Sequence, residues 1–386
     1  MDTEQMVPTD GADPKPAFDA EPARRSVGWP SRLALGIAIV VLAAVVAGFV
    51  IRVPYTTIAP GEALSLPPRV TVKGAPSYAD PRGDIRLLFV REANNVNLWR
   101  YVQSRYFSSD IHVVRDSAVN PNKMTPAQMN SQALQQMADA KSSATAVALG
   151  AAGYKVETAP GLVVNDLFVD LPAIKTLQWG DVIISADGKK ISKASDLTDA
   201  IANHDAGDDV TLVVSRGGKN VTQKVRIATS QGRKVIGVEV SPRFKFPVKV
   251  SVDTTGIGGP SAGLAMSLAI LDDLTPGNLT GGAHVAVTGT INPAGQVGEI
   301  GGIEQKAVAA RAAHVTLFLV PQCSPDDSPA ALAGCKDDLV RTAKRAGSKI
   351  KVVPVASFAE ALKVLRENGG AAVTTTSTTT TTIPTA

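Results

Sequence analysis

The stretch with the residue types for catalysis is GIGGPSAGLAMSLAIL, which runs from Gly256 to Leu271. A glycine cluster, a proline and a serine lead directly into an apolar segment of good helix formers, so we expect Ser261 to lie where a tight turn becomes a helix. The first N–H groups of a helix lack intrahelical partners and form a natural oxyanion site. Ser261 is therefore a candidate nucleophile, although an N-capping serine or an anion-binding turn explains the same local pattern equally well.

The residues around Ser261 are candidates for an oxyanion and substrate-binding loop. Gly258 and Gly259 let the main chain approach a substrate closely, and Pro260 fixes the turn. Ala262 is small and leaves the serine hydroxyl uncrowded, and we expect the N–H groups of Ser261 and Ala262 to bind the oxyanion. These glycines do not form a nucleotide-binding P-loop, because no Lys-Ser/Thr pair follows them.

A serine hydroxyl is a poor nucleophile until a base takes its proton, and Lys306 is the candidate base. It lies in a second stretch, VTGTINPAGQVGEIGGIEQKAVAARAA, near the start of a helix whose small residues predict close packing. Burial lowers the pKa of a lysine toward neutrality, which would make its amine a proton acceptor. An ordinary surface lysine is the alternative. A Ser-His-Asp triad with His284 or His314 as the base competes, but neither histidine lies in a recognisable motif.

The two stretches together resemble the Ser–Lys proteolytic domain of Lon proteases. GGPSAGLAMSLAIL, VTGTI and GGIEQKAVAARAA match that family in order and spacing, with 45 positions between Ser261 and Lys306, over about residues 248–321. The resemblance implies that Ser261 is the nucleophile and Lys306 the general base. It also implies that the hydroxyl of Thr288 orients the lysine amine.

The sequence departs from Lon proteases in two respects. Several members carry an acid two residues after that threonine and another before the Gly-Pro-Ser, where this chain has Thr290 and Gly258. Lon proteases also commonly carry an ATPase module, whereas no Walker A motif occurs in this sequence. We therefore expect a Ser–Lys dyad without a supporting carboxylate, working without ATP, a metal or another cofactor.

An apolar segment near the N-terminus predicts a transmembrane helix over residues 33–52. Its part from Leu33 to Ile51 contains nineteen residues without a charge, close to the ~20 that a bilayer-spanning helix needs. The composition of residues 1–28 predicts a polar, disordered tail. More basic residues precede the apolar segment than follow it, so we expect this tail in the cytoplasm and the rest of the chain outside. A cleaved signal peptide is the rival interpretation, but the apolar run is longer than such peptides carry.

The stretch LQWGDVIISADGKKISKASDLTDAI resembles a PDZ domain, which we expect over residues 154–229. PDZ domains bind a peptide by adding it to a sheet edge through main-chain hydrogen bonds. The resemblance would place Gly161, Leu162 and Val163 at the carboxylate-binding loop, where Pro160 to Val163 departs from the usual Gly-Leu-Gly-Phe pattern. A packing module that binds no peptide is the alternative.

The remaining segments complete an α+β multidomain chain with a single N-terminal transmembrane helix, a β-rich PDZ domain and an α/β Lon-type proteolytic domain. We expect a membrane-proximal α+β region over 53–150, whose helix opens with a capping box at Thr125, and the proteolytic domain over 233–368. The Thr-rich residues 371–386 predict a disordered tail. Cys323 and Cys335 either form a disulfide or remain two thiols, and they supply too few ligands for a metal site.

The order of anchor, PDZ domain and Lon-type domain is similar to that of bacterial membrane-anchored PDZ-Lon proteases. The resemblance implies an ATP-independent serine endopeptidase that cleaves extracytoplasmic peptides or accessible protein segments, contacts membrane lipid through its N-terminal helix and can form a homo-oligomer. The net charge of +4 is scattered and disfavours a nucleic-acid partner. The alternative function is a catalytically inactive, membrane-tethered peptide-binding scaffold or adaptor.

Overall fold

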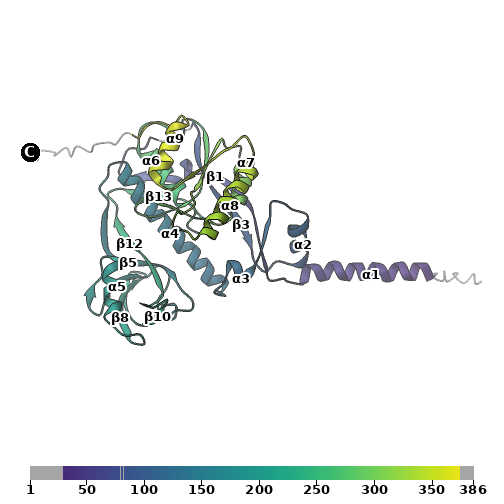
Figure 1. The fold of residues 1–386 in the computed structure, drawn as a ribbon, viewed down its shortest axis with the longest axis horizontal. Helices are drawn as coiled ribbons and strands as arrows, with labels where there is room; N and C mark the ends of the chain where they lie inside the picture. The colour runs from purple at the N-terminus through teal and green to yellow at the C-terminus, as the bar shows by residue number, and fades with distance from the viewer. Residues whose placement is uncertain (1–28, 79, 81, 374–386) are drawn as a thin grey trace, which may run out of the picture. The chain divides into compact units, whose positions relative to one another are not determined.

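The structure is a computed structural model that describes residues 29–78, 80 and 82–373 (Figure 1). The tail expected over 1–28 and most of that expected over 371–386 lie outside the described residues. The chain divides into two units after Ile51. In the first unit, α1 (Trp29–Val50) is the one helix among the described residues that is long and apolar enough to cross a membrane. A signal sequence near the N-terminus would have the same length and apolarity.

The second unit is built on a six-stranded sheet in the order β18-β17-β14-β3-β1-β4. The strands are β1 (Tyr55–Ser65), β3 (Asp84–Ala93), β4 (His112–Arg115), β14 (His284–Val287), β17 (Leu317–Pro321) and β18 (Lys351–Val355). From β3 to β18 the neighbours are parallel, whereas β1 runs antiparallel to both β3 and β4. The sequence places residues 53–150 in a region of their own; in the structure they instead supply half of the sheet that carries the proteolytic motifs.

Helices cover both faces of this sheet. The helices are α4 (Pro126–Ala151), α6 (Gly263–Leu274) and α9 (Phe358–Glu367) on one face, and α7 (Ile303–Ala312) and α8 (Pro329–Ala346) on the other. The alternation within β14 reflects this arrangement, because Val285 and Val287 join the first core and Ala286 joins the second. Parallel strands covered on both faces explain why VAV and LFLVP are continuous apolar runs.

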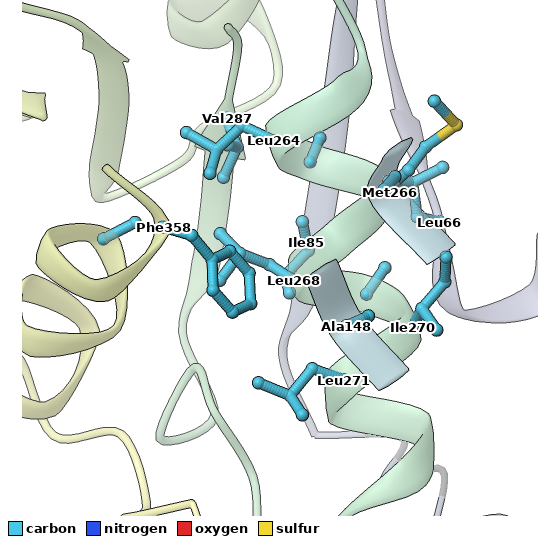
Figure 2. Close-up of a cluster of buried hydrophobic side chains, with 14 of the residues drawn as sticks. Leu66, Ile85, Ala148, Leu264, Met266, Leu268, Ile270, Leu271, Val287 and Phe358 are labelled. Atoms are coloured by element: carbon cyan, nitrogen blue, oxygen red, sulfur yellow. The ribbon is translucent and has the colours of Figure 1, made fainter. Parts of the chain in front are cut away.

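Helix α6 is enclosed almost completely. Every one of its residues except Asp273 is buried, and Figure 2 shows Leu264, Leu268 and Leu271 among side chains from several other elements, including Phe358. A helix that is apolar on all sides must be surrounded by protein. The turn that precedes α6, which contains Ser261, is consequently attached to one of the most rigidly packed elements of the domain.

A separate core forms the PDZ-like lobe, whose sheet has the order β12-β5-β6-β8-β9. Its elements are β5 (Glu157–Leu167), β6 (Val182–Ala186), β7 (Lys189–Lys190), α5 (Ala194–Ala202), β8 (Asp209–Arg216), β9 (Lys219–Arg226) and β12 (Val238–Lys245). The sequence assigns residues from 233 onward to the proteolytic domain, but β12 pairs with β5 and therefore completes the sheet of this lobe. Alternating apolar residues in β12 cannot by themselves show which sheet the strand joins.

Helix α4 connects the two cores. The expected capping box is present, since the Thr125 hydroxyl accepts from the Gln128 amide and the Gln128 side chain accepts from the Thr125 amide. Beyond this start, α4 packs against α6. The Nε2 atom of Gln132 in α4 donates to Oδ1 and Oδ2 of Asp166 in β5 at 2.8 and 2.7 Å. The helix thus joins the PDZ-like lobe to the proteolytic core.

The remaining elements are short: η1 (Pro67–Arg69), β2 (Val70–Lys73), α2 (Leu98–Tyr106), α3 (Asp116–Val119), η2 (Pro172–Lys175), β10 (Ala228–Ser230), β11 (Arg233–Val235), β13 (Lys249–Val252), β15 (Thr290–Ile291) and β16 (Val297–Gly298). Among them, β13 pairs with β2 and so ties the start of the proteolytic segment to the N-terminal strands.

We predict that Leu87→Ala, a change in β3, destabilises the whole proteolytic core. Leu87 is 1% exposed and belongs to the same core as the strands of the C-terminal half, so its truncation should cost about 2 to 5 kcal/mol. Hydrogen exchange at the amides of β14 and β17 measures this loss. Arg91→Ala, on an exposed position of the same strand, is the matched control. Unchanged protection of β14 and β17 in the Leu87→Ala variant would contradict the shared core.

Candidate active site

Three candidate catalytic side chains meet at one point. The Nζ atom of Lys306 donates to Ser261 Oγ at 2.8 Å and lies 3.0 Å from Thr288 Oγ1. The Thr288 hydroxyl in turn donates to the backbone carbonyl of Ser261 at 3.2 Å. Thr288 therefore accepts from the amine and donates to the main chain of the serine, so it fixes the position of the amine relative to Ser261. The three side chains come from the α6 turn, the segment after β14 and α7.

Ser261 is not a helix cap. Helix α6 begins at Gly263 with Ala262 at its N-cap, and no side chain caps this end. The helix start is instead held by main-chain bonds to the segment after β14: the Gly289 amide donates to Ser261 at 3.0 Å, and the Leu264 amide donates to Gly289 at 3.1 Å. The hydroxyl of Ser261 remains available to Lys306.

Lys306 occupies an unusually dry environment for an amine. Its side chain is 2% exposed, and burial lowers the pKa from its ordinary value of 10.5 to about 7, a change that the charge of Glu92 opposes. No ion pair to Lys306 occurs among the described residues, which leaves the amine without a carboxylate partner. Desolvation without a compensating charge disfavours the ammonium form, so a substantial fraction of the amine is neutral near pH 7.

The burial of Lys306 depends on a close approach of α7 to the N-terminal strands. Gly302 precedes α7 with a φ of +65°, and a Cβ atom there would lie 2.8 Å from Val90 Cγ1 in β3. Glycine therefore satisfies both the left-handed backbone and the contact. Helix α7 packs on β1 and β3, and these strands help to exclude water from the amine.

The loop before Ser261 lies directly against α4. The Gly259 amide donates to the Ala133 carbonyl at 2.9 Å, and a Cβ atom on Gly258 would lie 2.9 Å from Ala133 Cβ. An acidic side chain at position 258 would have to displace this helix. Glycine at position 258, where several Lon proteases carry an acid, therefore leaves the space that Ala133 of α4 occupies.

Two backbone amides at Ser261 are without a hydrogen-bond acceptor among the described residues. Among the described residues, the amides of Ser261 and Ala262 donate no hydrogen bond, whereas the next amide, that of Gly263, donates to Pro260 at 3.2 Å. Together with the left-handed Gly259, whose φ is +86°, this turn leaves two adjacent N–H groups beside the hydroxyl. Such a pair can stabilise an oxyanion that forms next to Ser261.

A groove of about 890 Å³ reaches the residue before Ser261. Its walls come from α4, from β5 and β12, and from the loops at positions 260, 290–299 and 322–326. Five carboxylates line it: Asp139, Asp166, Glu239, Glu299 and Asp326. Its described lining contains no lysine or arginine. Burial, reinforced by the charges of Asp166 and Asp139, raises the pKa of Glu239, as expected for a crowded acidic site.

Cys323 and Cys335 form a disulfide, with their Cα atoms 5.8 Å apart. The bond ties the loop after β17 to α8, and Cys323 itself lines the groove. The sequence left open a disulfide or two thiols, and the structure has the disulfide. Within the described residues no group of three or more His, Cys, Asp and Glu side chains is placed to hold a metal ion.

The rival base His284 has other partners. Its Nδ1 atom lies 2.6 Å from Asp84 Oδ1 and 3.1 Å from an Arg86 nitrogen, at the start of β14 rather than at its end, where Thr288 follows. His314 lies in the turn after α7 with a φ of +54°. The described hydrogen-bond partners of the Ser261 hydroxyl include Lys306 and neither histidine.

The peptide contacts expected at Gly161, Leu162 and Val163 are not available for strand addition. These residues lie in β5, which is paired on both sides: Leu162 is opposite Pro242 of β12 and Ile183 of β6. A peptide can join a sheet only at an unpaired edge, and in this sheet the edge next to β5 belongs to β12. Binding of a peptide carboxylate by these three residues stays a prediction, whereas strand addition at this end of the sheet would use β12.

The sequence missed several residues that surround the site. Val90 and Glu92 come from β3, and Ala133 comes from α4, more than a hundred positions before Ser261. Nothing local in the sequence marks these residues, because strand pairing and helix packing bring them to the site.

Comparison with known proteins identifies two domains. Residues 135–227 match the PDZ domain family, and residues 227–361 match the Lon protease (S16) C-terminal proteolytic domain. These matches confirm the expected pair of domains, the mixed α+β fold class and the assignment to the serine peptidase class of domain. The family boundaries start the PDZ match within α4, in agreement with the contacts between this helix and β5.

Individual relatives cover parts of the chain. A Lon protease from Buchnera aphidicola is 29% identical over 39% of this chain, and one from Clostridioides difficile is 41% identical over 18% of it. The alignments span only 18% and 8% of these two proteins. The solved PDZ domain of an SdrC-like protein from Listeria monocytogenes is 27% identical, with 22% of this chain and 90% of that domain covered and a TM-score of 0.21.

We predict that Lys306→Met stabilises the fold at neutral pH. At pH 7 and below, the unfolded lysine is charged in water while the folded one must carry its charge in a dry site, and each unit of pKa depression costs about 1.4 kcal/mol. Allowing for the two lost hydrogen bonds, we expect a gain of about 2 kcal/mol, measured by urea denaturation.

The sign of the pH dependence provides the control for this variant. The folded pKa lies below the unfolded one, so the unfolded parent binds more protons between pH 7 and about 10 and the parent gains stability as the pH rises. The advantage of Lys306→Met should therefore shrink over that interval and disappear above it. An advantage that stays constant from pH 7 to 10 would show that Lys306 has an ordinary pKa.

Proposed function

Because residues 227–361 belong to the Lon protease C-terminal proteolytic domain family, we propose that this chain is a serine endopeptidase that cleaves accessible peptide segments by a Ser–Lys dyad without ATP. The observation that carries the proposal is the 2.8 Å contact between the buried Lys306 amine and the Ser261 hydroxyl. A desolvated amine with a pKa of about 7 has the basicity that a general base needs at neutral pH.

The chemical steps follow from the positions of these groups. The neutral Lys306 amine takes the proton of Ser261 as Oγ attacks the scissile carbonyl, and the resulting oxyanion binds to the free amides of Ser261 and Ala262. Each such donor typically contributes about 3 to 4 kcal/mol to transition-state stabilisation. The Lys306 ammonium then gives its proton to the leaving amine, and a water molecule activated by the neutral lysine hydrolyses the acyl-enzyme.

The groove supplies a path for the substrate between the two domains. Its lining includes Glu239, Val240 and Ser241 of the edge strand β12 at one side and Pro260 beside the nucleophile at the other. We place the substrate along this groove, with an extended peptide added to β12 at one side and its scissile bond at Ser261. The PDZ lobe therefore serves as the capture site, and the dyad cuts the captured segment.

The proposed location is a membrane, with α1 as a single-pass anchor and the catalytic unit outside the cytoplasm. The 19-residue span from Arg32 to Val50 has the length and apolarity that anchoring requires. The basic residues before this span favour a cytoplasmic N-terminus. A disulfide at the groove is consistent with an oxidising compartment.

An inactive peptide-binding scaffold is the second candidate function. The free edge of β12 would serve a scaffold as well as a protease. A scaffold, however, gains nothing from burying an unpaired amine beside a serine hydroxyl, an arrangement that costs folding free energy. Assembly into a homo-oligomer is compatible with either function.

We predict that the full chain in detergent micelles cuts unfolded peptides without ATP, and that Ser261→Ala and Lys306→Ala each lower kcat/KM by at least about 10³-fold, as loss of a nucleophile or its base does in other serine peptidases. Thr288→Val should lose about 10- to 100-fold, since it removes a hydrogen bond to the base. Mass spectrometry of the products measures these rates, and kcat/KM of the parent should rise with pH through about 7.

Circular dichroism of each variant is the control for folding. Cleavage that persists in both folded Ser261→Ala and Lys306→Ala variants would contradict the dyad. Cleavage that requires ATP would contradict the energy-independent reaction. A parent that cuts none of a diverse peptide library but binds peptides would favour the scaffold.

We predict that the acidic groove selects basic substrates. Peptides with lysine or arginine flanking the cleaved bond should be cut about fivefold faster than matched peptides with glutamate there, because one partly exposed charge pair contributes about 1 kcal/mol. The preference should weaken at high salt and in an Asp326→Asn, Glu299→Gln variant. Competition between paired peptides in one reaction measures the ratio. Equal rates for both peptides would show that the substrate does not follow this groove.

A further inference from the structure

Helix α2 presents large aromatic side chains to the solvent. Tyr106 is 71% exposed and Phe107, which follows the helix, is 80% exposed, whereas most aromatic rings in folded domains are largely covered. Trp99 is 41% exposed on the same helix. An exposed patch of this kind in a folded unit marks a surface that contacts another molecule or a membrane.

These residues share one side of α2. Trp99, Gln103, Tyr106 and Phe107 are spaced by four, three and one positions, which places them along one face of a helix with 3.6 residues per turn. Arg100 lies next to this face and is exposed as well. The helix thus combines Trp, Tyr and Phe with a guanidinium group, the residue types that are enriched where protein meets lipid headgroups.

The opposite side of α2 is attached to the catalytic unit. Ser104 is buried, and the ring of Tyr101 lies 4.7 Å from that of Tyr55 in β1. The N-cap Asn97 accepts from the Arg100 amide at 2.8 Å, which fixes where the helix begins. Helix α2 is therefore an ordered element with one packed side and one open aromatic side.

Chain continuity brings the start of α2 to the point where the apolar span ends. Asn97 forms a β-bridge with Arg52, and the Val53 amide donates to the Val96 carbonyl at 2.9 Å. Arg52 follows a span that ends at Val50, and two residues extend less than about 8 Å. Asn97 lies one strand spacing, about 5 Å, from Arg52. If α1 crosses a bilayer, Asn97 must therefore lie within about 13 Å of the point where the span leaves the bilayer.

We propose that α2 is a membrane-surface helix whose face formed by Trp99, Tyr106 and Phe107 inserts into the headgroup region of the bilayer that α1 crosses. The inference rests on the proposed anchoring through α1. The insertion attaches the catalytic unit to the bilayer at a second place, on the strand β1 against which α7 and its Lys306 pack. The unit is then held at the membrane surface instead of swinging on a single connection, which favours substrates with segments close to the bilayer.

The test uses the full chain with a nitroxide label at Gln103→Cys, reconstituted in vesicles of phosphatidylethanolamine and phosphatidylglycerol. This exposed position lies on the aromatic face and leaves all three rings in place, and the native cysteines are already paired. Collision of the label with oxygen, which concentrates in the bilayer, is compared with collision with a water-soluble nickel chelate. Reference labels replace Leu42 in α1 and the exposed Val340 in α8.

We expect the label at position 103 to collide more often with oxygen than with the chelate, and the label at position 340 to show the reverse. Adding Tyr106→Ser and Phe107→Ser should return the label at position 103 toward the aqueous values. A label at position 103 that is as aqueous as that at 340, while the label at 42 lies in the bilayer, would overturn the inference alone. Aqueous values at position 42 would overturn the proposed anchoring and the inference together.

Discussion

The structure depends on the enclosure of one amine. Lys306 can serve as a base only while its charge is disfavoured, and the 2% exposure of this residue is what disfavours the charge. The same enclosure leaves two hydroxyls, from Ser261 and Thr288, as the polar groups that its Nζ atom contacts. Under the proposed function, reactivity at this site is obtained at the expense of stability, a common relation at active sites.

The enclosure requires a part of the chain far from the catalytic motifs. Strands β1 and β3 close the sheet beside α7, and α4 covers the loop before Ser261. These elements lie between the apolar span and the PDZ lobe in sequence, so the proteolytic core cannot form until residues from before the PDZ lobe return to meet residues from after it. The PDZ lobe is therefore inserted in sequence between two segments of the proteolytic core, and its strands β5 and β12 contribute residues to the groove.

The sequence was informative where chemistry and local geometry coincide. The glycine-rich turn and apolar helix made Ser261 a candidate, but the resemblance to Lon proteases was needed to select Ser261 with Lys306 and to add Thr288. The capping box at Thr125 is a purely local device. Strand partners could not be predicted in the same way, because alternation within β12 or β3 specifies a buried face but not a neighbour. The pairing of β5 with β12, and the joining of strands from residues 53–150 to the sheet of the proteolytic motifs, therefore became visible only in the structure.

Under the proposed function, residues of the edge strand β12 in the lining of the groove link peptide capture to catalysis. Strand addition at β12 uses main-chain groups and so accepts many sequences, whereas the carboxylates of the groove act on side chains. Under the proposed function, selectivity comes from charge in the peptide segment nearest Ser261 and not from the strand added to β12. Because the disulfide holds the loop with Asp326 in place, one wall of that acidic surface is fixed before a substrate arrives, and less ordering entropy opposes binding.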